Sequence, residues 1–187
     1  MNELTIRVLG LDDVRMRLGR LSPEATKVMR MAINDTAQQA RKQLNDEARQ
    51  RYVVKKTKFN KSLVLKRATN TSLTATLTSK GKPLPLSYFE IRKNGKRKAG
   101  QGHQLKSTSL TPIRKEENKS FTGRLSNGHR GLFYRSSEKR YPILQVYGSS
   151  VPSMIGGRSV YGRLEPVINS NLQDNLQRHI DLVLRRM

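Results

Sequence analysis

Residues 22–52, SPEATKVMRMAINDTAQQARKQLNDEARQRY, decide the fold, because they predict one long helix against which the rest of the chain must pack. Ser22 can accept hydrogen bonds from free helix amides, Pro23 suits the first helical position, and Glu24 complements the helix dipole. Small and aliphatic residues then recur at helical spacing to about Tyr52, which predicts a helix packed closely along one side. The stripe consists of Ala25, Val28, Ala32, Thr36, Ala40, Leu44 and Ala48.

Short strands are predicted on both sides of this helix. Leu4, Ile6 and Val8 alternate with polar residues and predict a strand, after which residues 11–21 fit the stripe of a short helix. Downstream, alternating Leu, Ala and Thr residues at 73–78 predict a strand with one buried face. Three further short strands are predicted at 121–125, 131–135 and 141–147.

A second helix is predicted to close the chain. After the turn at Gly156-Gly157, apolar residues recur every four positions, which is typical of a helix with one apolar stripe. The stripe consists of Leu164, Ile168, Leu172, Leu176, Ile180 and Leu184. Helices, then a mostly antiparallel sheet, then a helix predict an α+β fold, and 187 residues fit a single domain over residues 1–187.

One long segment lacks such a pattern. Residues 92–138 are basic and predict a loop-rich excursion from the domain. Its first part, residues 92–119, is polar and offers little apolar surface to offset the entropy of ordering. We therefore expect this part to be disordered in the isolated subunit and ordered in an assembly.

The charge of the chain predicts a polyanionic neighbour. Lys and Arg number 37 against 14 Asp and Glu, and the formal net charge of +23 exceeds what solubility requires. Residues 51–140 hold 23 basic and only 4 acidic side chains, whereas both ends of the chain are nearly neutral. The partner contact is therefore expected in the middle of the chain.

Two basic tracts in that region are the candidate nucleic-acid-binding site. Such tracts can face a phosphate backbone, and the alternatives are a solvated face or a contact with acidic protein neighbours. No helix-turn-helix, zinc finger or ribonucleoprotein motif is present, so sequence-specific reading of bases is not predicted. The candidate residues are Lys55, Lys56, Lys58, Lys61, Lys66 and Arg67 in the first tract, and Arg92, Lys93, Lys96, Arg97 and Lys98 in the second.

Catalytic, metal and cofactor sites are not predicted. The chain has no cysteine, which excludes disulfides, thiol nucleophiles and cysteine-based zinc sites. His103, His129 and His179 have no Asp, Glu or His nearby in the sequence at the spacing of a ligand set. A nuclease would need convergent carboxylates for its metals, and the basic region has few acids. We therefore expect no enzyme and no cofactor, and no apolar run is long enough to predict a membrane span.

Five short runs follow one another along the chain: Met31-Ala32-Ile33-Asn34, Leu65-Lys66-Arg67-Ala68-Thr69, Pro83-Leu84-Pro85-Leu86, Arg140-Tyr141-Pro142-Ile143 and Val151-Pro152. In this order they resemble the phage lambda minor tail protein Z family of tail-completion proteins. The resemblance covers about residues 1–91 and 139–187 and does not extend into residues 92–138.

The resemblance implies a structural virion protein of the phage tail and neck. Such subunits are expected to form a homo-oligomeric ring, with six copies as the expected number, at the head-proximal end of the tail. The implied partners are further copies of the chain, the adjacent tail-terminator and head-tail connector proteins, and genomic double-stranded DNA on its path through the ring. The expected location is the virion, with assembly in the host cytoplasm. The alternative from another class is a free, non-specific nucleic-acid-binding protein.

Overall fold

The computed structural model describes residues 2–9, 23–54, 61–92, 101–108, 111–112, 114–115, 118–125, 128 and 130–185. The elements that we call the body are β1 (Asn2–Leu9), α2 (Pro23–Arg51), β2 (Leu63–Lys66), β3 (Thr74–Gly81), α4 (Val151–Gly156) and α5 (Tyr161–Leu184). Those that we call the lobe are η1 (Leu86–Tyr88), β4 (Glu90–Arg92), β5 (Gln101–His103), β6 (Thr111–Pro112), β7 (Arg114–Lys115), β8 (Asn118–Lys119), β9 (Phe121–Arg124), β10 (Arg130–Arg135) and β11 (Ile143–Gln145). The α+β class is confirmed.

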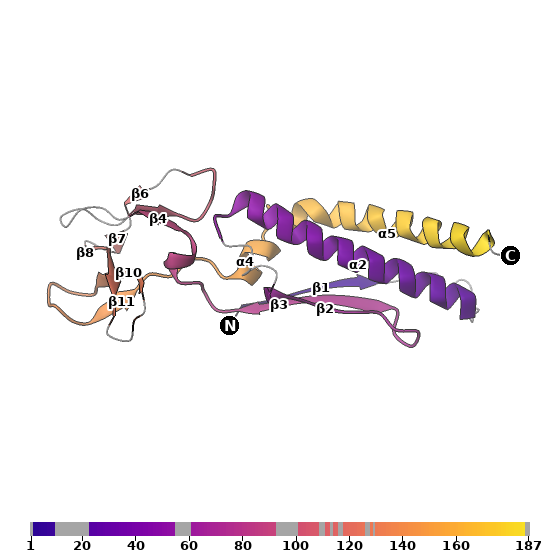
Figure 1. Cartoon of the computed structure of the whole chain (residues 1–187), viewed down its shortest axis with the longest axis horizontal. Coiled ribbons are helices and arrows are strands. Elements are labelled where there is room, and N and C mark those ends of the chain that lie inside the picture. The colour runs from indigo at the N-terminus through magenta and orange to yellow at the C-terminus, as the bar shows by residue number, and fades with distance from the viewer. Residues whose placement is uncertain are drawn as a thin grey trace.

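The long helix α2 runs through the middle of the body, as Figure 1 shows. It occupies Pro23–Arg51, so the predicted helix is confirmed, while Ser22 lies outside the described residues. Its buried side is built mainly from alanine and other small residues, which allow neighbouring backbones to approach closely. The fully buried members are Ala32, Ile33, Thr36, Ala37, Ala40, Leu44 and Ala48.

A three-stranded antiparallel sheet packs against α2. Its strand order is β1-β3-β2, which makes β2 an edge strand. In β3, Ala75, Leu77 and Ser79 are buried and alternate with partly exposed threonines, as the sequence predicted. The strand predicted from Leu4, Ile6 and Val8 is confirmed as β1, whereas the short helix predicted at residues 11–21 lies outside the described residues.

The closing helix α5 lies antiparallel to α2, on the side of α2 away from the sheet (Figure 1). Ile168 is buried, and Leu164, Leu172 and Leu176 pack partly against the core. The predicted stripe is wrong at Ile180, which is 42% exposed. The reason is that the buried position beside Ile180 is taken by the polar residue His179, so the apolar stripe leaves the buried face at this end of α5.

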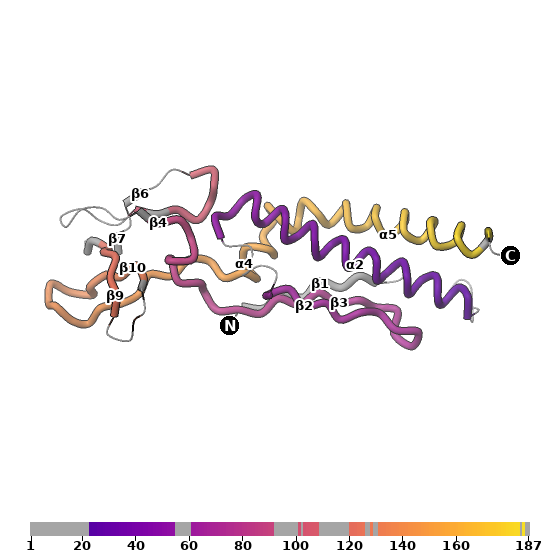
Figure 2. Tube along the Cα trace, viewed as in Figure 1, coloured from indigo at the N-terminus to yellow at the C-terminus, as the bar shows by residue number. Residues whose placement is uncertain are grey.

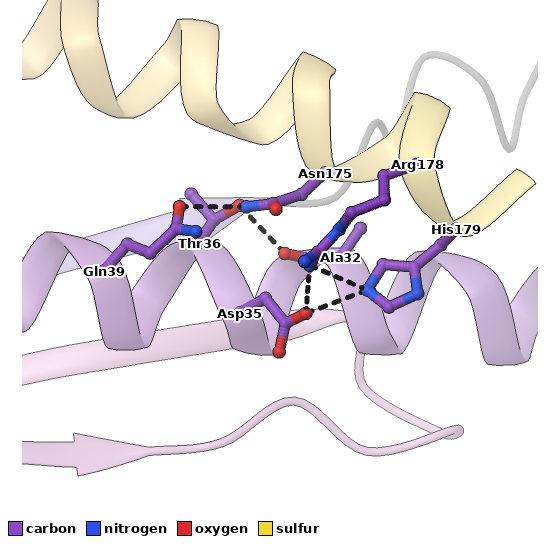
Figure 3. Close-up of polar contacts among 7 residues, drawn as sticks. All are labelled: Ala32, Asp35, Thr36, Gln39, Asn175, Arg178 and His179. Atoms are coloured by element: carbon purple, nitrogen blue, oxygen red, sulfur yellow. Dashed lines mark hydrogen bonds and ion pairs between the residues drawn. The ribbon is translucent and has the colours of Figure 1, made fainter. Parts of the chain in front are cut away.

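A polar seam joins the two helices (Figure 3). The Asn175 side chain, 5% exposed, donates to Thr36 Oγ1 at 3.0 Å and to Gln39 Oε1 at 3.1 Å. The Thr36 hydroxyl in turn donates to the Ala32 carbonyl at 2.8 Å. One turn toward the start of α5, Asn171 donates to Gln43. Because these groups must face one another to be satisfied, they fix the register of α5 on α2.

The short helix α4 precedes α5 and was not predicted. Ser150 caps it, since its hydroxyl accepts from the amide of Ser153, and Pro152 stands near its start where a proline is tolerated. Four of its six residues are buried. It contacts α2, β1 and β3 and so closes the end of the body nearest the lobe.

The lobe is built from short antiparallel strands. The sheet β11-β10-β9 confirms the three strands predicted between Phe121 and Tyr147. Where a loop was predicted between residues 92 and 119, part of the described chain forms short strands, in the sheet β4-β5-β6 and the pair β7-β8. These pairings run over two or three residues and rest on backbone hydrogen bonds, so they leave no apolar alternation in the sequence. Residues 104–108, which follow β5, belong to no strand.

Backbone contacts attach the lobe to the body at two places. At one, Pro85 bridges to Tyr147, and the amide of Gly148 donates to the Leu84 carbonyl at 2.8 Å. The proline-containing run at residues 83–85 forms this connection and leads into η1 at Leu86. At the other, the residues that follow α2 meet those that follow β5, and the amide of Val53 donates to the Gln104 carbonyl at 2.9 Å.

Candidate nucleic-acid interface

The first predicted tract lies on and beside the edge strand β2. Lys61, Lys66 and Arg67 are exposed, and Arg67 donates to Gln38 of α2 at 3.3 Å. Lys55, Lys56 and Lys58 lie outside the described residues. The structure therefore brings three of the six predicted cations onto one edge of the body.

The outer face of β2 and β3 is polar and solvent-facing. Leu63 and Leu65 pack inward, so the alternating residues Val64 and Lys66 point outward, and Val64 is 63% exposed. In the register of the sheet, Lys66 pairs with Thr76 of β3. Lysine ammonium groups on such a face can contact phosphates as point charges, and they carry no base specificity.

The second predicted tract is described only at its beginning. The backbone of Arg92 belongs to β4, where it pairs with Gln101 of β5. The side chain of Arg92, and all of Lys93, Lys96, Arg97 and Lys98, lie outside the described residues. Their contact with DNA or protein stays a prediction.

The aromatic residues divide between core and surface. Phe89 and Phe133 are buried and belong to the core. Tyr141 and Tyr147, by contrast, are 63% and 55% exposed. Their rings are therefore free to contact a partner.

A further basic group at the tip of the lobe was missed from the sequence. It comprises Arg135 at the end of β10 and Lys139, Arg140 and Tyr141 in the connection to β11. The Arg135 guanidinium lies 5.3 Å from the centroid of the Phe121 ring, and the Arg140 guanidinium lies 5.7 Å from that of Tyr141. The signal that could have revealed it was the run Glu138 to Tyr141, in which two cations and an aromatic residue follow one another between two strands.

An open hollow of about 400 Å³ lies where the end of α2 meets the lobe. Arg49 and Lys106 contribute positive charge and Glu90 a negative one, while Tyr52 and Tyr88 contribute ring surface. The remaining lining residues are Val53, Val54 and Phe89. Its mixed charge and shallow form do not define a ligand.

Two of the three histidines are described, and each contacts one carboxylate. His103 Nε2 lies 3.1 Å from Glu90 Oε2 across β4 and β5. The hydrogen bond with Glu90, followed by that with the Thr108 carbonyl, raises the pKa of His103 above its ordinary value. His129 lies outside the described residues.

His179 is buried in the seam between the helices (Figure 3). Asp35 of α2 lies 2.9 Å from its Nε2 and accepts from Arg178 at 2.6 Å. This partner was not visible from local spacing, because Asp35 is 144 residues away in the chain. Within the described part of the chain, no three His, Asp or Glu side chains come together as a metal site would require.

Together these features define a small, strongly basic α+β protein whose described surface offers cations and exposed rings rather than a set of reacting groups. Among the described residues, no helix has the length and apolar character needed to cross a membrane. A family model described as prophage minor tail protein Z (GPZ) matches residues 8–187. The chain therefore belongs to this family and is a structural protein of a phage tail, which confirms the resemblance seen in the sequence. No curated protein and no solved structure matches the chain.

Proposed function

We propose that the protein is a tail-completion component that forms a ring at the head-proximal end of the tail, joins tail to head and surrounds the path of the DNA. The proposal rests mainly on one observation, which is that the positive charge of this phage tail protein is concentrated in the middle of its chain. Residues 51–140 hold 23 basic and 4 acidic side chains, and the described cations Lys61, Lys66 and Arg67 are exposed. A ring lined with such cations would hold a passing duplex by its backbone without reading bases.

The edges of the body sheet support assembly into a ring. β1 and β2 are the outer strands of the sheet, so each has one side free of a strand within the described residues. Unpaired strand edges are usually covered in the functional state of a protein, and neighbouring subunits would cover them in a closed ring. Adjacent tail-terminator and head-tail connector proteins would then contact the two ends of the ring.

Deletion of the gene from the phage or prophage that carries it tests the proposal. We expect full heads and finished tails to accumulate separately in negative-stain electron micrographs, and a plasmid copy of the gene to restore joined, infectious particles. Joined particles of normal infectivity in the deletion strain would overturn the proposal.

The mass of the purified protein tests the ring and the alternative of a free nucleic-acid-binding protein. Light scattering coupled to gel filtration should give a multiple of the 21.3 kDa subunit, either alone or with its neighbours added. A subunit that remains a monomer with all neighbours and binds DNA only as a monomer supports the alternative.

A further inference from the structure

We propose that the tip of the lobe, formed by Arg135 and the β10–β11 connection at residues 136–142, binds the phosphate backbone of DNA without reading its sequence. The proposal rests on the proposed function, because it identifies a part of the subunit that meets the DNA. None of the residues predicted from the basic tracts belongs to this tip. It is therefore a second candidate surface, separate from β2.

Charge and exposure favour an anionic ligand at the tip. Arg135, Lys139 and Arg140 stand against the single acid Glu138. Every residue from 136 to 142 is exposed. Exposed Lys and Arg side chains can approach phosphates at little cost of desolvation, and their counterion release makes the binding depend on salt.

Contacts at its base hold the connection in one arrangement. Arg135 lies over the Phe121 ring and donates through Nη1 to the Arg140 carbonyl at 3.3 Å. Pairing of Arg135 with Ile143 closes the strands immediately behind it. Because the cations start from a constrained segment, less conformational entropy is lost when they bind than in a free loop.

Tyr141 is the feature that separates this tip from an ordinary solvated charge run. It leaves 63% of its surface in solvent beside the Arg140 guanidinium, whereas Phe133, on the strand leading into the tip, is 2% exposed. A tyrosine in this position can donate its hydroxyl to a phosphate oxygen and stack its ring on an unpaired base. A side chain this exposed contributes little to packing of the core, so contact with a ligand is the role that remains for the Tyr141 ring.

The position of the tip suits contact with a rod. Figure 2 shows the β10–β11 connection at one end of the long axis of the molecule, with the end of α5 at the other. A duplex can therefore approach the tip without meeting the helices of the body. The alternative ligand of the tip is an acidic protein surface. The following experiment distinguishes it from DNA.

Fluorescence anisotropy of a labelled duplex of about 30 base pairs, titrated with full-length protein over a salt series, tests the proposal. Replacement of both Lys139 and Arg140 by Gln should reduce the slope of log affinity against log salt by nearly two, about 0.9 for each lost phosphate contact. Affinity near 0.1 M salt should fall on the order of tenfold to a hundredfold. Randomising the duplex sequence should change nothing.

The matched control replaces Lys27 and Lys42 by Gln, which removes the same charge from exposed positions of α2 that belong to neither candidate surface. An effect equal to that of the tip variant would show that net charge alone matters and would overturn the proposal. So would an unchanged affinity and slope in the tip variant, as an acidic protein partner predicts. Circular dichroism confirms that each variant is folded. In a parallel titration with a single-stranded oligonucleotide, Tyr141→Ala should weaken binding more than it weakens binding to the duplex.

Failure of this proposal and failure of the proposed function give different results. If deletion of the gene blocks head-tail joining while the tip variant binds DNA normally, only the tip proposal fails. If joining proceeds without the gene but the tip variant loses DNA binding, the tip proposal stands and the proposed function fails.

Discussion

Replacement of Asn175 tests whether polar contacts or apolar burial hold α5 against α2. Asn175→Ala removes the hydrogen bonds to Thr36 at 3.0 Å and to Gln39 at 3.1 Å. Each is worth about 0.5–1.5 kcal/mol net. Gln39 is exposed and can bind water instead, and Thr36 still donates to Ala32, so we expect a loss of about 1–2 kcal/mol in the free energy of unfolding.

Urea unfolding followed by far-ultraviolet circular dichroism measures this loss. With an m-value of about 2 kcal/mol per molar urea, the midpoint should fall by roughly 0.5–1 M. The control is Asn169→Ala on the same helix, where the side chain is exposed and the change only improves helix propensity, by a few tenths of a kcal/mol.

Asn175→Leu separates stability from register. An apolar side chain of similar size removes the polar group and its desolvation together, so we expect stability to stay within about 1 kcal/mol of the wild type or to rise. Exchange of α5 amide protons should nevertheless become faster, because the match that fixes the register is gone. The reasoning would be refuted if Asn175→Ala were no more destabilising than Asn169→Ala, or if Asn175→Leu cost more than Asn175→Ala.

Two further predictions concern the lobe. Gly148→Ala would place a Cβ 2.6 Å from Cε2 of Phe89, so we expect overpacking to cost about 1–3 kcal/mol in thermal or urea unfolding. Gly162→Ala in α5 meets nothing closer than 3.6 Å and should be neutral or stabilising, and equal losses in both variants would contradict the argument. The interaction of His103 with Glu90 raises the histidine pKa, so its contribution to β4–β5 pairing is complete below pH of about 6.5 and is lost as pH rises through the raised value. A nuclear magnetic resonance titration should show His103 with a pKa above its ordinary value, and Glu90→Gln should lower that pKa toward the ordinary value, with the Thr108 contact still in place.

The main elements of the body could be predicted well because each buries one side, and burial of one side leaves a regular apolar pattern in the sequence. The start signals at Pro23 and Glu24 and the alanine stripe fixed α2, and the alternation around Leu77 fixed β3. The error at Ile180 has a physical cause, since the buried face of α5 there is carried by Asn175 and His179. Hydrophobic periodicity cannot find a polar interface.

The candidate site could be predicted less well, because charge runs show where cations are and not how they are arranged. Lys61 and Lys66 came from the sequence and are exposed on one edge of the body. The tip residue Arg140 lies in a run of only three charged residues, and Arg135 is brought to it by a strand end and the connection that follows. The partner of His179 was out of reach for the same reason, because only the antiparallel packing of the helices brings Asp35 to it.

The lobe resembles an insertion into the body, because the chain enters and leaves it at two points that lie side by side. The chain leaves the body at Leu84 and returns at Gly148, and a hydrogen bond of 2.8 Å already joins these two residues. A short loop could replace everything between them without stretching the body, since domain insertions are tolerated where the two ends lie close together. The geometry therefore allows this module to be lengthened, recharged or exchanged without moving the sheet and the two long helices of the body.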